Sequence, residues 1–442
     1  MQFKRDILPE LFNWKNAKDR KPLLLKGARQ VGKTSLLKEF GKNAFTEVAY
    51  FNFEENPGLK QFFENTKDVK RIIDNLSLVH GSSIQAQDTL IIFDEIQECN
   101  PALNTLKYFC ENAPEYAIAS AGSLLGITLG KEASFPVGKV DFIDIYPLTF
   151  IEFLNGFEPK LAEYMMHARH TEPIPDIFFQ SLLEKFKMYF ISGGMPEAAR
   201  KLVAEKSVTS TQHILKTILT GYALDFSKHA PSKDIARIGY VWNSIPSHLA
   251  RENKKFLYQT VKPGAKSREY EDALLWLIQA GLIYKVSRCA KPNLPLSAYD
   301  DLSAFKLYLF DIGLLRNLAQ LDHEVINNGN TLFTEFKGSL SENYILQSLV
   351  SQFDSMPRYW TSEGKAEIDF ILQYKNTIIP IEVKSDENIR SKSMTFYHQK
   401  YNPNIRIRFS LRNFSFKEGL LNIPLFMADQ TKRILENVLT EI

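Results

Sequence analysis

The fold of the first part of this chain is decided by one stretch, Gly27-Ala28-Arg29-Gln30-Val31-Gly32-Lys33-Thr34. It has the spacing G-x-x-x-x-G-K-[ST] of a phosphate-binding loop, or P-loop. The apolar run Leu23-Leu24-Leu25 precedes it, as a buried strand would, and residues compatible with a helix follow from Ser35. A strand before the loop and a helix after it are the context that this motif requires. The sequence therefore predicts a strand, an anion-binding loop and a helix in succession, and a chance match of a glycine-containing turn is the alternative.

The residue types in this loop suit the phosphates of a nucleotide. Gly27 and Gly32 let successive backbone N–H groups turn toward one anion, and the helix behind them adds its positive dipole end. We expect Lys33 to reach the outer phosphates, Thr34 to help hold Mg²⁺ and Ser35 to lie in the same site. The expected cofactors are therefore ATP and Mg²⁺.

Length and composition describe an ordinary globular protein of several domains. The chain has 442 residues, 44% of them apolar and 24% charged, and a formal net charge of +3. Such a balance allows a nucleic-acid partner without requiring one. Three scattered cysteines, at positions 99, 110 and 289, favour a reducing compartment over a disulfide framework. No stretch reaches the ~18 apolar residues of a membrane span, so we expect a cytoplasmic protein without a membrane partner.

Strands and helices alternate from about residue 20 to 150. We expect further strands at residues 49–53, 89–93, 116–121 and 140–145, with helices at 58–80 and 103–109. This alternation predicts an α/β fold, with a mostly parallel sheet covered on both faces.

Two acidic residues follow the expected strand at 89–93. In a parallel sheet, Asp94 and Glu95 would lie at the carboxyl end of that strand, where ligands bind. We expect Asp94 to hold Mg²⁺ and Glu95 to orient and deprotonate the attacking water. Ser123, after the next strand, is a candidate contact for the γ-phosphate or its water. The alternatives are a strand end that caps the next helix, for the two acids, and a simple turn, for Ser123.

Six short segments of the chain together resemble one family of known proteins. These segments are the P-loop, Asp94-Glu95, Ala121-Gly122-Ser123, Tyr146-Pro147-Leu148-Thr149-Phe150, Gly193-Gly194-Met195-Pro196-Glu197 and residues 306–315. The family that they resemble is that of the prokaryotic AAA+-like ATPases (AAA_14 type) that carry a C-terminal DUF4143 domain. The resemblance spans nearly the whole chain and implies ATP hydrolysis, a helical lid and a possible homo-oligomer. Where the family commonly has Gly-Arg, this chain has Gly138-Lys139, and lysine lacks the planar fork of an arginine finger. Arg200 and Arg237 are candidate nucleotide sensors or surface residues.

The middle of the chain changes character. Residues 151–225 are expected to be helical and to form the lid. Residues 226–330 combine helices with a strand pair at 281–286 and 306–310, which is typical of a winged helix. The recognition helix would be residues 269–280, which are apolar and not basic, so DNA reading and a structural role both stay open.

A second set of charged residues lies in the last segment, residues 331–442. Two alternating stretches at 367–372 and 378–384 predict a hairpin whose tip is Lys375-Asn376, so that the numbers of facing residues sum to 751. Asp369 then lies across from Glu382, and a divalent cation would offset their repulsion. Lys384 would position a water or stabilise a phosphate. Pro380 indicates an edge or an irregular strand.

This pattern resembles the PD-(D/E)xK nuclease-like fold, which usually adds a glutamate on the preceding helix. Glu342 is the candidate, and its alternative is a capping box with Ser339, which needs no metal. The implied catalytic residues are Asp369, Glu382 and Lys384, and the implied metal ligands are Glu342, Asp369 and Glu382. A surface ladder of charges is the alternative for the hairpin.

The sequence thus predicts four segments: a P-loop ATPase domain (1–150), a helical lid (151–225), a winged-helix-like part (226–330) and a nuclease-like part (331–442). The first functional hypothesis is a Mg²⁺-dependent ATPase that acts on DNA, with the last segment cutting. The second is a nucleotide-controlled switch whose last segment binds nucleic acid or protein without cutting. A small-molecule kinase is the third, and the Asp94-Glu95 pair favours hydrolysis over it.

Overall fold

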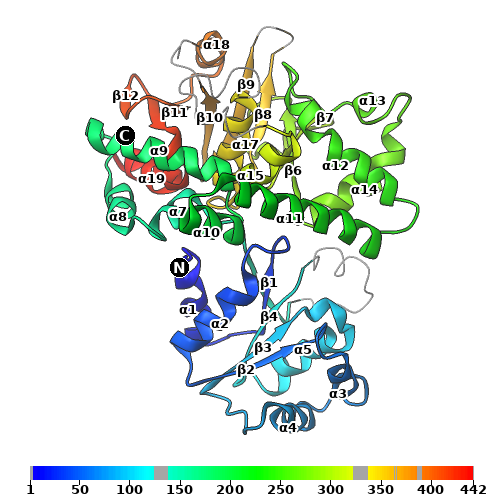
Figure 1. Cartoon of the computed structure of the whole chain (residues 1–442). Coiled ribbons are helices and arrows are strands. Elements are labelled where there is room, and N and C mark those ends of the chain that lie inside the picture. The colour runs from blue at the N-terminus through cyan, green and yellow to red at the C-terminus, as the bar shows by residue number, and fades with distance from the viewer. Residues whose placement is uncertain are drawn as a thin grey trace. The chain divides into compact units, whose positions relative to one another are not determined.

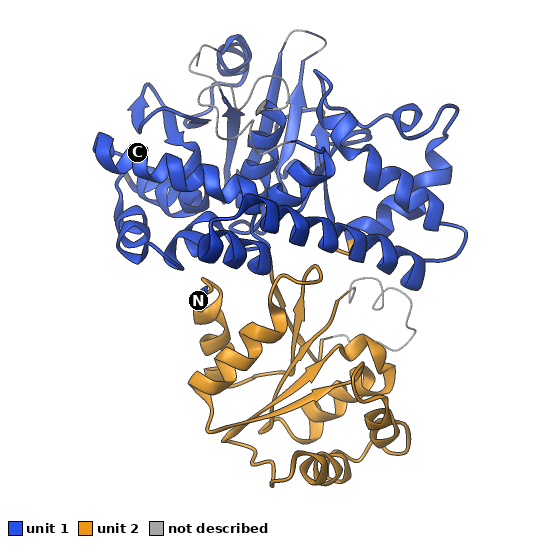
Figure 2. Cartoon of the chain, viewed as in Figure 1, with its two compact units in different colours: residues 1–4, 147–278, 282–442 blue, residues 5–146, 279–281 orange. Residues whose placement is uncertain are grey.

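The computed structural model describes residues 3–123, 138–321, 337–362, 364, 366–385 and 391–441. Contacts between residues divide the chain into two compact units, which Figure 2 shows in two colours. We call residues 5–146 with 279–281 the P-loop unit, and residues 1–4, 147–278 and 282–442 the second unit.

The P-loop unit is built on a sheet of five parallel strands in the order β2-β3-β4-β1-β5 (Figure 1). The strands are β1 (Leu23–Lys26), β2 (Glu47–Asn52), β3 (Thr89–Asp94), β4 (Ala117–Ala121) and β5 (Asp141–Asp144). Every residue of β3 and of β4 is buried, as expected for the central strands of a parallel sheet covered on both faces. The predicted α/β architecture is confirmed.

Helices cover both faces of this sheet. They are α1 (Leu8–Asn16), α2 (Lys33–Ala44), α3 (Gln61–Glu64), α4 (Val69–His80) and α5 (Asn100–Asn112), with short 3₁₀ turns at Pro57–Lys60 and Ile96–Glu98. On one face, Ile91 and Phe93 of β3 pack in a single apolar cluster with Ile72 of α4 and Leu106 of α5. On the other face, Gly41 of α2 comes so close that an added Cβ would lie 3.1 Å from Leu90.

The second unit contains a mixed sheet of eight strands in the order β12-β13-β11-β10-β9-β8-β6-β7. The strands are β6 (Ile283–Cys289), β7 (Asp300–Leu309), β8 (Arg358–Thr361), β9 (Glu367–Tyr374), β10 (Thr377–Val383), β11 (Arg406–Ser410), β12 (Ser415–Lys417) and β13 (Leu420–Pro424). The strand pair expected in the middle of the chain is present as β6 and β7. Because β6 also pairs with β8, this pair continues into the sheet of the last segment. The division of this unit into lid, winged-helix-like and nuclease-like parts stays a prediction.

Helices make up the rest of the second unit. They are α7 (Phe150–Asn155), α8 (Pro159–His167), α9 (Asp176–Ser192), α10 (Pro196–Glu205), α11 (Val208–His229), α12 (Ile235–Leu249), α13 (Tyr258–Val261), α14 (Ser267–Gln279), α15 (Ile312–Leu318), α17 (Lys337–Val350), α18 (Lys392–Tyr401) and α19 (Thr431–Glu441), with 3₁₀ turns at Leu296–Tyr299 and Leu425–Gln430. The expected run of helices after residue 150 is therefore seen in α7 to α11.

Two buried aspartates connect distant parts of the second unit. Asp311 caps α15 by accepting from the backbone N–H of Leu314 at 2.9 Å, and it also accepts from Gly194 N at 2.7 Å. Asp429 accepts from Phe150 N at 2.6 Å, at the start of α7. The segments around α7 and before α10 are thus held to the start of α15 and to the 3₁₀ turn at Leu425–Gln430 by buried hydrogen bonds.

The β9–β10 hairpin has the predicted register. Its pairs run from Tyr374 with Thr377 to Phe370 with Ile381, and each pair of numbers sums to 751. Pro380 was expected to mark an edge or a locally irregular strand. The strand β10 is not an edge strand, because it has a partner on each side, but the ladder to β11 does not include Pro380. Proline is tolerated there because β11 pairs with β10 only from Ile381 onward.

The turn between α9 and α10 gives the first prediction. The backbone of Gly194 packs so closely that an added Cβ would lie 2.3 Å from Leu148 O. We expect Gly194→Ala to lower the free energy of unfolding by about 1–3 kcal/mol, as in overpacked cores. The matched control is Gly221→Ala within α11, where an added Cβ would have no atom of the described residues outside its own helix within 4 Å. That change should raise stability by about 0.5–1 kcal/mol, because alanine is the better helix former. Urea unfolding of both variants measures the difference, and equal midpoints would contradict the close approach.

Candidate functional site

The P-loop connects β1 to α2 through glycines that no other residue could replace. Gly27 has φ 144°, and a Cβ there would lie 2.2 Å from Ile145 O. Gly32 has φ 95° and stands at the N-cap of α2. The loop therefore needs glycine at both positions, for close approach at the first and for a left-handed backbone at the second.

Lys33, the first residue of α2, is buried and lies back over the loop. Its Nζ donates to Gly27 O at 2.9 Å and to Ala28 O at 2.7 Å. Burial lowers the pKa of Lys33 to about 8, while the charges of Glu95 and Asp94 act to raise it. The ammonium group is thus held at the mouth of the loop and close to both acids. Ser35, two residues further along α2, is exposed.

The structure brings Thr34 together with Asp94, which ends β3. Thr34 Oγ1 donates to both carboxylate oxygens of Asp94, at 3.0 and 2.9 Å. This contact follows from the strand order, because β4 alone separates β1 from β3 and all three strands end at the same edge of the sheet.

Tyr50 of β2 is a site residue that the sequence did not suggest. Its hydroxyl donates to Asp94 Oδ2 at 2.7 Å, and Lys38 Nζ lies 3.6 Å from the centre of its ring. Burial, with the hydrogen bond to Asp94, raises the pKa of Tyr50 above its usual value. The pairing of β2 with β3 is the signal that could have indicated Tyr50. It places Asn52 beside Asp94, and Tyr50, two residues before Asn52, lies on the same side of the strand.

Glu95 lies beside Ser123, which follows β4. Glu95 Oε2 accepts from Ser123 Oγ at 3.2 Å and from Gln97 Nε2 at 2.6 Å. The backbone of Glu95 has φ 49°, a left-handed conformation that a residue other than glycine adopts at a cost of order 1 kcal/mol and that is common at functional sites. Gln97 is a second residue that the sequence did not suggest, and its buried Oε1 has no hydrogen-bond partner among the residues that the structure describes. Two side chains therefore fix the orientation of this carboxylate.

These groups fit a nucleotide with Mg²⁺. The Thr34 hydroxyl and the Asp94 carboxylate are hard oxygen donors of the kind that Mg²⁺ prefers. The buried ammonium of Lys33 and the N-terminus of the twelve-residue helix α2 supply positive charge for phosphates. The arrangement can hold a polyphosphate and keep a carboxylate, Glu95, available as a base.

The basic residues considered as an arginine finger or as nucleotide sensors pair with other side chains or are exposed. Lys139 Nζ pairs with Glu111 Oε1 at 3.0 Å, and this contact raises the pKa of Lys139. In the second unit, Arg237 pairs with Asp234 at 3.2 Å and Arg200 is exposed.

In the second unit, the predicted metal ligands have separate partners. Glu342 points inward from α17, where Lys254 Nζ pairs with its Oε1 and Tyr308 OH donates to its Oε2 at 3.2 Å. The capping-box alternative for Glu342 is wrong, because α17 begins before Ser339 and that serine donates to Leu249 O. Burial acts to raise the pKa of Glu342, but the charges of Lys254 and Lys306 outweigh it and lower the pKa.

Asp369 and Glu382 also lie in different surroundings. The strand β9 is irregular near Asp369. Its residues Ile368 and Ile371 share one apolar cluster, although residues three apart in a regular strand point to opposite faces. The pairing of β8 with β9 also shifts register at this level. The β9–β10 ladder ends at Ile381, one pair short of Glu382 and Asp369. Instead, Asp369 Oδ2 accepts from Val383 N at 2.8 Å. Burial and the charge of Glu342 raise the pKa of Asp369 to about 7.

Glu382 is held by hydroxyl and ammonium groups. Ser391 Oγ donates to its Oε1 at 2.5 Å and Lys384 Nζ pairs with the same oxygen at 3.1 Å. Over the described residues, no group of three or more His, Cys, Asp or Glu side chains is arranged to hold a metal ion. The structure therefore does not bring Glu342, Asp369 and Glu382 together as a ligand set, and their metal site remains a prediction.

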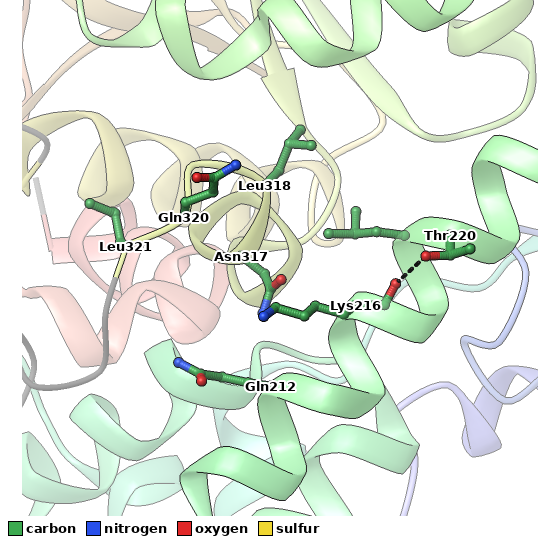
Figure 3. A pocket seen from close by; sticks show the side chains of 8 residues that line it. Gln212, Lys216, Thr220, Asn317, Leu318, Gln320 and Leu321 are labelled. Atoms are coloured by element: carbon green, nitrogen blue, oxygen red, sulfur yellow. Dashed lines mark hydrogen bonds between the residues drawn. The ribbon is translucent and has the colours of Figure 1, made fainter.

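The second unit also has a hollow of about 660 Å³ between α11 and the end of α15 (Figure 3). Gln212, Lys216 and Thr220 line it from α11, and Asn317 and Gln320 line it from the opposite side. The polar groups of this hollow are the amine of Lys216, the amides of Gln212, Asn317 and Gln320, and the hydroxyl of Thr220. This combination does not indicate a particular class of ligand.

Comparison with known families assigns three parts of the chain. Residues 19–154 match the AAA domain family AAA_14, and residues 337–426 match a domain of unknown function, DUF4143. Residues 183–325 match another domain of unknown function, DUF8612. No curated protein matches the chain.

Several solved structures are similar. The Walker-type ATPase of Pyrococcus abyssi is 14% identical, with 72% of this chain and 96% of that chain covered and a TM-score of 0.45. The Orc1 protein of Aeropyrum pernix in complex with DNA is 12% identical, with 71% and 90% covered and a TM-score of 0.29. The RuvB branch migration motor of Thermotoga maritima is 13% identical, with 66% and 91% covered and a TM-score of 0.29. With the P-loop and its parallel sheet in place, the family matches identify the chain as one that carries an AAA domain of the AAA_14 family followed by a DUF4143 domain.

Proposed function

We propose that the P-loop unit binds ATP with Mg²⁺ and hydrolyses it. The observation that carries this proposal is the assembly of Lys33, the Thr34–Asp94 pair and the Glu95–Ser123 pair at one edge of the parallel sheet. On binding, Lys33 would exchange the carbonyls of Gly27 and Ala28 for the β- and γ-phosphates. Thr34 and Asp94 would hold Mg²⁺, which neutralises charge that develops on the phosphates.

Glu95 is the proposed general base. A carboxylate beside the γ-phosphate can orient a water and accept its proton, and this contribution is typically 10²–10⁴-fold in rate. Ser123 and Gln97 hold the carboxylate of Glu95 at one oxygen, so they are proposed as positioning residues. This arrangement favours hydrolysis over a kinase, which has to exclude water from the phosphate.

For the second unit, we propose nucleotide-controlled binding of a macromolecule, with DNA or protein as the partner. The helix proposed to read DNA, α14, carries Arg268 against three acids, Glu269, Glu271 and Asp272, and it exposes about half of Leu275. Acidic residues oppose contact with phosphates, whereas an exposed leucine suits an apolar protein surface. This observation favours the switch hypothesis over direct base reading by α14.

The chain is proposed to act in the cytoplasm. Its three cysteines are free, as expected in a reducing compartment. Among the described residues, no helix is long and apolar enough to cross a membrane.

The proposed ATP site predicts distinct effects for two substitutions. Lys33→Ala should abolish ATP binding, because it removes the charge that faces the outer phosphates. Glu95→Gln should keep binding but lower turnover by about 10²–10⁴-fold, because only the base is lost. The control is Lys42→Ala, an exposed lysine on the same helix. Binding of a fluorescent ATP analogue and phosphate release measure the two effects, and Glu95→Gln turning over at the parent rate would refute the base assignment.

The hydrogen bond from Tyr50 to Asp94 gives a separate prediction. Tyr50→Phe removes the donor and leaves the ring, so Asp94 should hold Mg²⁺ less firmly. A hydrogen bond to a charged group contributes about 1.5–3 kcal/mol, which corresponds to at least a tenfold higher Mg²⁺ requirement for ATP hydrolysis. Tyr108→Phe on α5 is the matched control. If the two variants have the same Mg²⁺ dependence, Tyr50 does not position Asp94.

The chain has Lys139 where the family commonly has an arginine. If the ATP site is completed by a neighbouring protomer, we therefore expect its basal ATP hydrolysis to be weak. If neighbouring protomers complete each other's sites, the ATPase activity per protomer should rise with protein concentration or on addition of DNA. Light scattering at the same concentrations reports the oligomeric state. A constant specific activity over a wide dilution range, with only monomer present, would rule out a homo-oligomeric site.

A further inference from the structure

A cluster of buried charges lies within the sheet of the second unit. Lys306 of β7 is fully buried, and its Nζ pairs with Glu367 of β9. Lys254, after α12, pairs with Glu342 of α17, and both side chains are largely buried. Asp369 of β9 completes the cluster, because its charge acts on Lys306 together with those of Glu342 and Glu367.

Each carboxylate of this cluster already has a donor or a cation at one oxygen or at both. Glu342 uses one oxygen for Lys254 and the other for the hydroxyl of Tyr308. Glu367 accepts from Lys306, and Asp369 accepts from the backbone of Val383. Burial acts to lower the pKa of Lys306, but the surrounding carboxylates outweigh it and raise the pKa, so the ammonium form is the one that this site holds.

A divalent cation does not fit these residues. Mg²⁺ demands near-octahedral coordination by oxygens, usually from one or two carboxylates together with several waters. Here two ammonium groups already supply positive charge to Glu342 and Glu367. Glu382 pairs elsewhere through Oε1, with Ser391 and Lys384, and its buried Oε2 is a single oxygen without a hydrogen-bond partner among the described residues. A buried charge is stable only when it is paired, and the two lysines meet that requirement without a metal.

We infer that Lys254 and Lys306 are the resident cations of this carboxylate cluster, in place of the divalent metal that a nuclease-like site requires. The cluster is therefore a metal-independent clamp that joins α17, β7 and β9, and the second unit holds its partner without metal-dependent cleavage. The inference deepens the proposed binding role of the second unit and does not depend on ATP hydrolysis.

The test follows the unfolding of the second unit alone, in the full chain. Of the four tryptophans, Trp14 lies in the P-loop unit, whereas Trp242, Trp276 and Trp360 lie in the second unit. In a Trp14→Phe background, tryptophan fluorescence thus reports only the second unit. Without nucleotide, its melting temperature should be the same in EDTA, Mg²⁺ and Mn²⁺.

Three variants in this background test the clamp. Lys306→Met keeps an unbranched side chain as far as Cε but removes the ammonium. It should therefore lower the melting temperature well below that of Lys384→Met, whose lysine is partly exposed. Adding Glu367→Gln to Lys306→Met should restore part of the loss, because the uncompensated carboxylate is neutralised. If Lys306→Met alone does not fold, refolding of the double variant supports the same pairing.

Three results would overturn the inference. The first is that the melting temperature of the parent rises with Mn²⁺ or Mg²⁺ and that Asp369→Asn abolishes this rise. The second is that Lys306→Met melts at the same temperature as Lys384→Met. The third concerns DNA cleavage. DNA incubated with the parent and Mn²⁺ should stay intact, and cleavage that Asp369→Asn abolishes would also refute the clamp. ATP hydrolysis, measured on the same proteins, separates a failure of this inference from a failure of the ATPase proposal.

Discussion

Each carboxylate that this fold removes from water has to be matched by hydrogen-bond donors or cations, and this constraint sets most of the polar geometry in both units. In the P-loop unit, Asp94 is matched by the hydroxyls of Thr34 and Tyr50. In the second unit, Asp311 and Asp429 are matched by backbone N–H groups, and burial raises the pKa of each to about 6. The same need accounts for the lysines beside Glu342 and Glu367.

The solutions differ because the two sites have different tasks. In the P-loop unit, the groups that satisfy Asp94 and Glu95 are hydroxyls and an amide, which orient the two carboxylates without neutralising their charge. Around Glu342, the hydroxyl of Tyr308 is joined by the ammonium groups of Lys254 and Lys306, whose charges offset that of the buried carboxylate. We therefore regard the first arrangement as one prepared for binding and the second as one that holds the fold together.

Sequence reasoning was most successful where local pattern and three-dimensional structure coincide. Uninterrupted apolar runs become central parallel strands, so the positions of β1 and β3 and the nearness of Asp94 to the P-loop followed directly. The hairpin register followed from its tip at Lys375 and Asn376. Tyr50 was missed because its role depends on which strands are neighbours in the sheet, and no local pattern encodes that order. Gln97 was missed although it lies only two residues from Glu95, because its contact depends on the left-handed backbone at Glu95.

The carboxylates of the last segment show why the rest could not be predicted. Strict alternation placed Asp369 opposite Glu382, but an irregularity in β9 intervenes, and nothing in the composition of residues 367–374 reveals it. The counter-charges were equally hidden, since Lys254 and Lys306 are distant in sequence from Glu342 and Glu367. Such contacts arise only when the whole sheet has formed.

The pairing of β6 with β8 limits where the chain can be cut into fragments or recombined between relatives. The match to DUF8612 ends at residue 325 and the match to DUF4143 begins at residue 337, which suggests a domain boundary between them. A fragment that starts at α17 would nevertheless expose the edge of β8 and lose both lysines that neutralise Glu342 and Glu367. Recombination between relatives at that boundary would thus separate acids from their cations. The two halves of the second unit have to be exchanged together, and substitutions in one half constrain those that the other can accept.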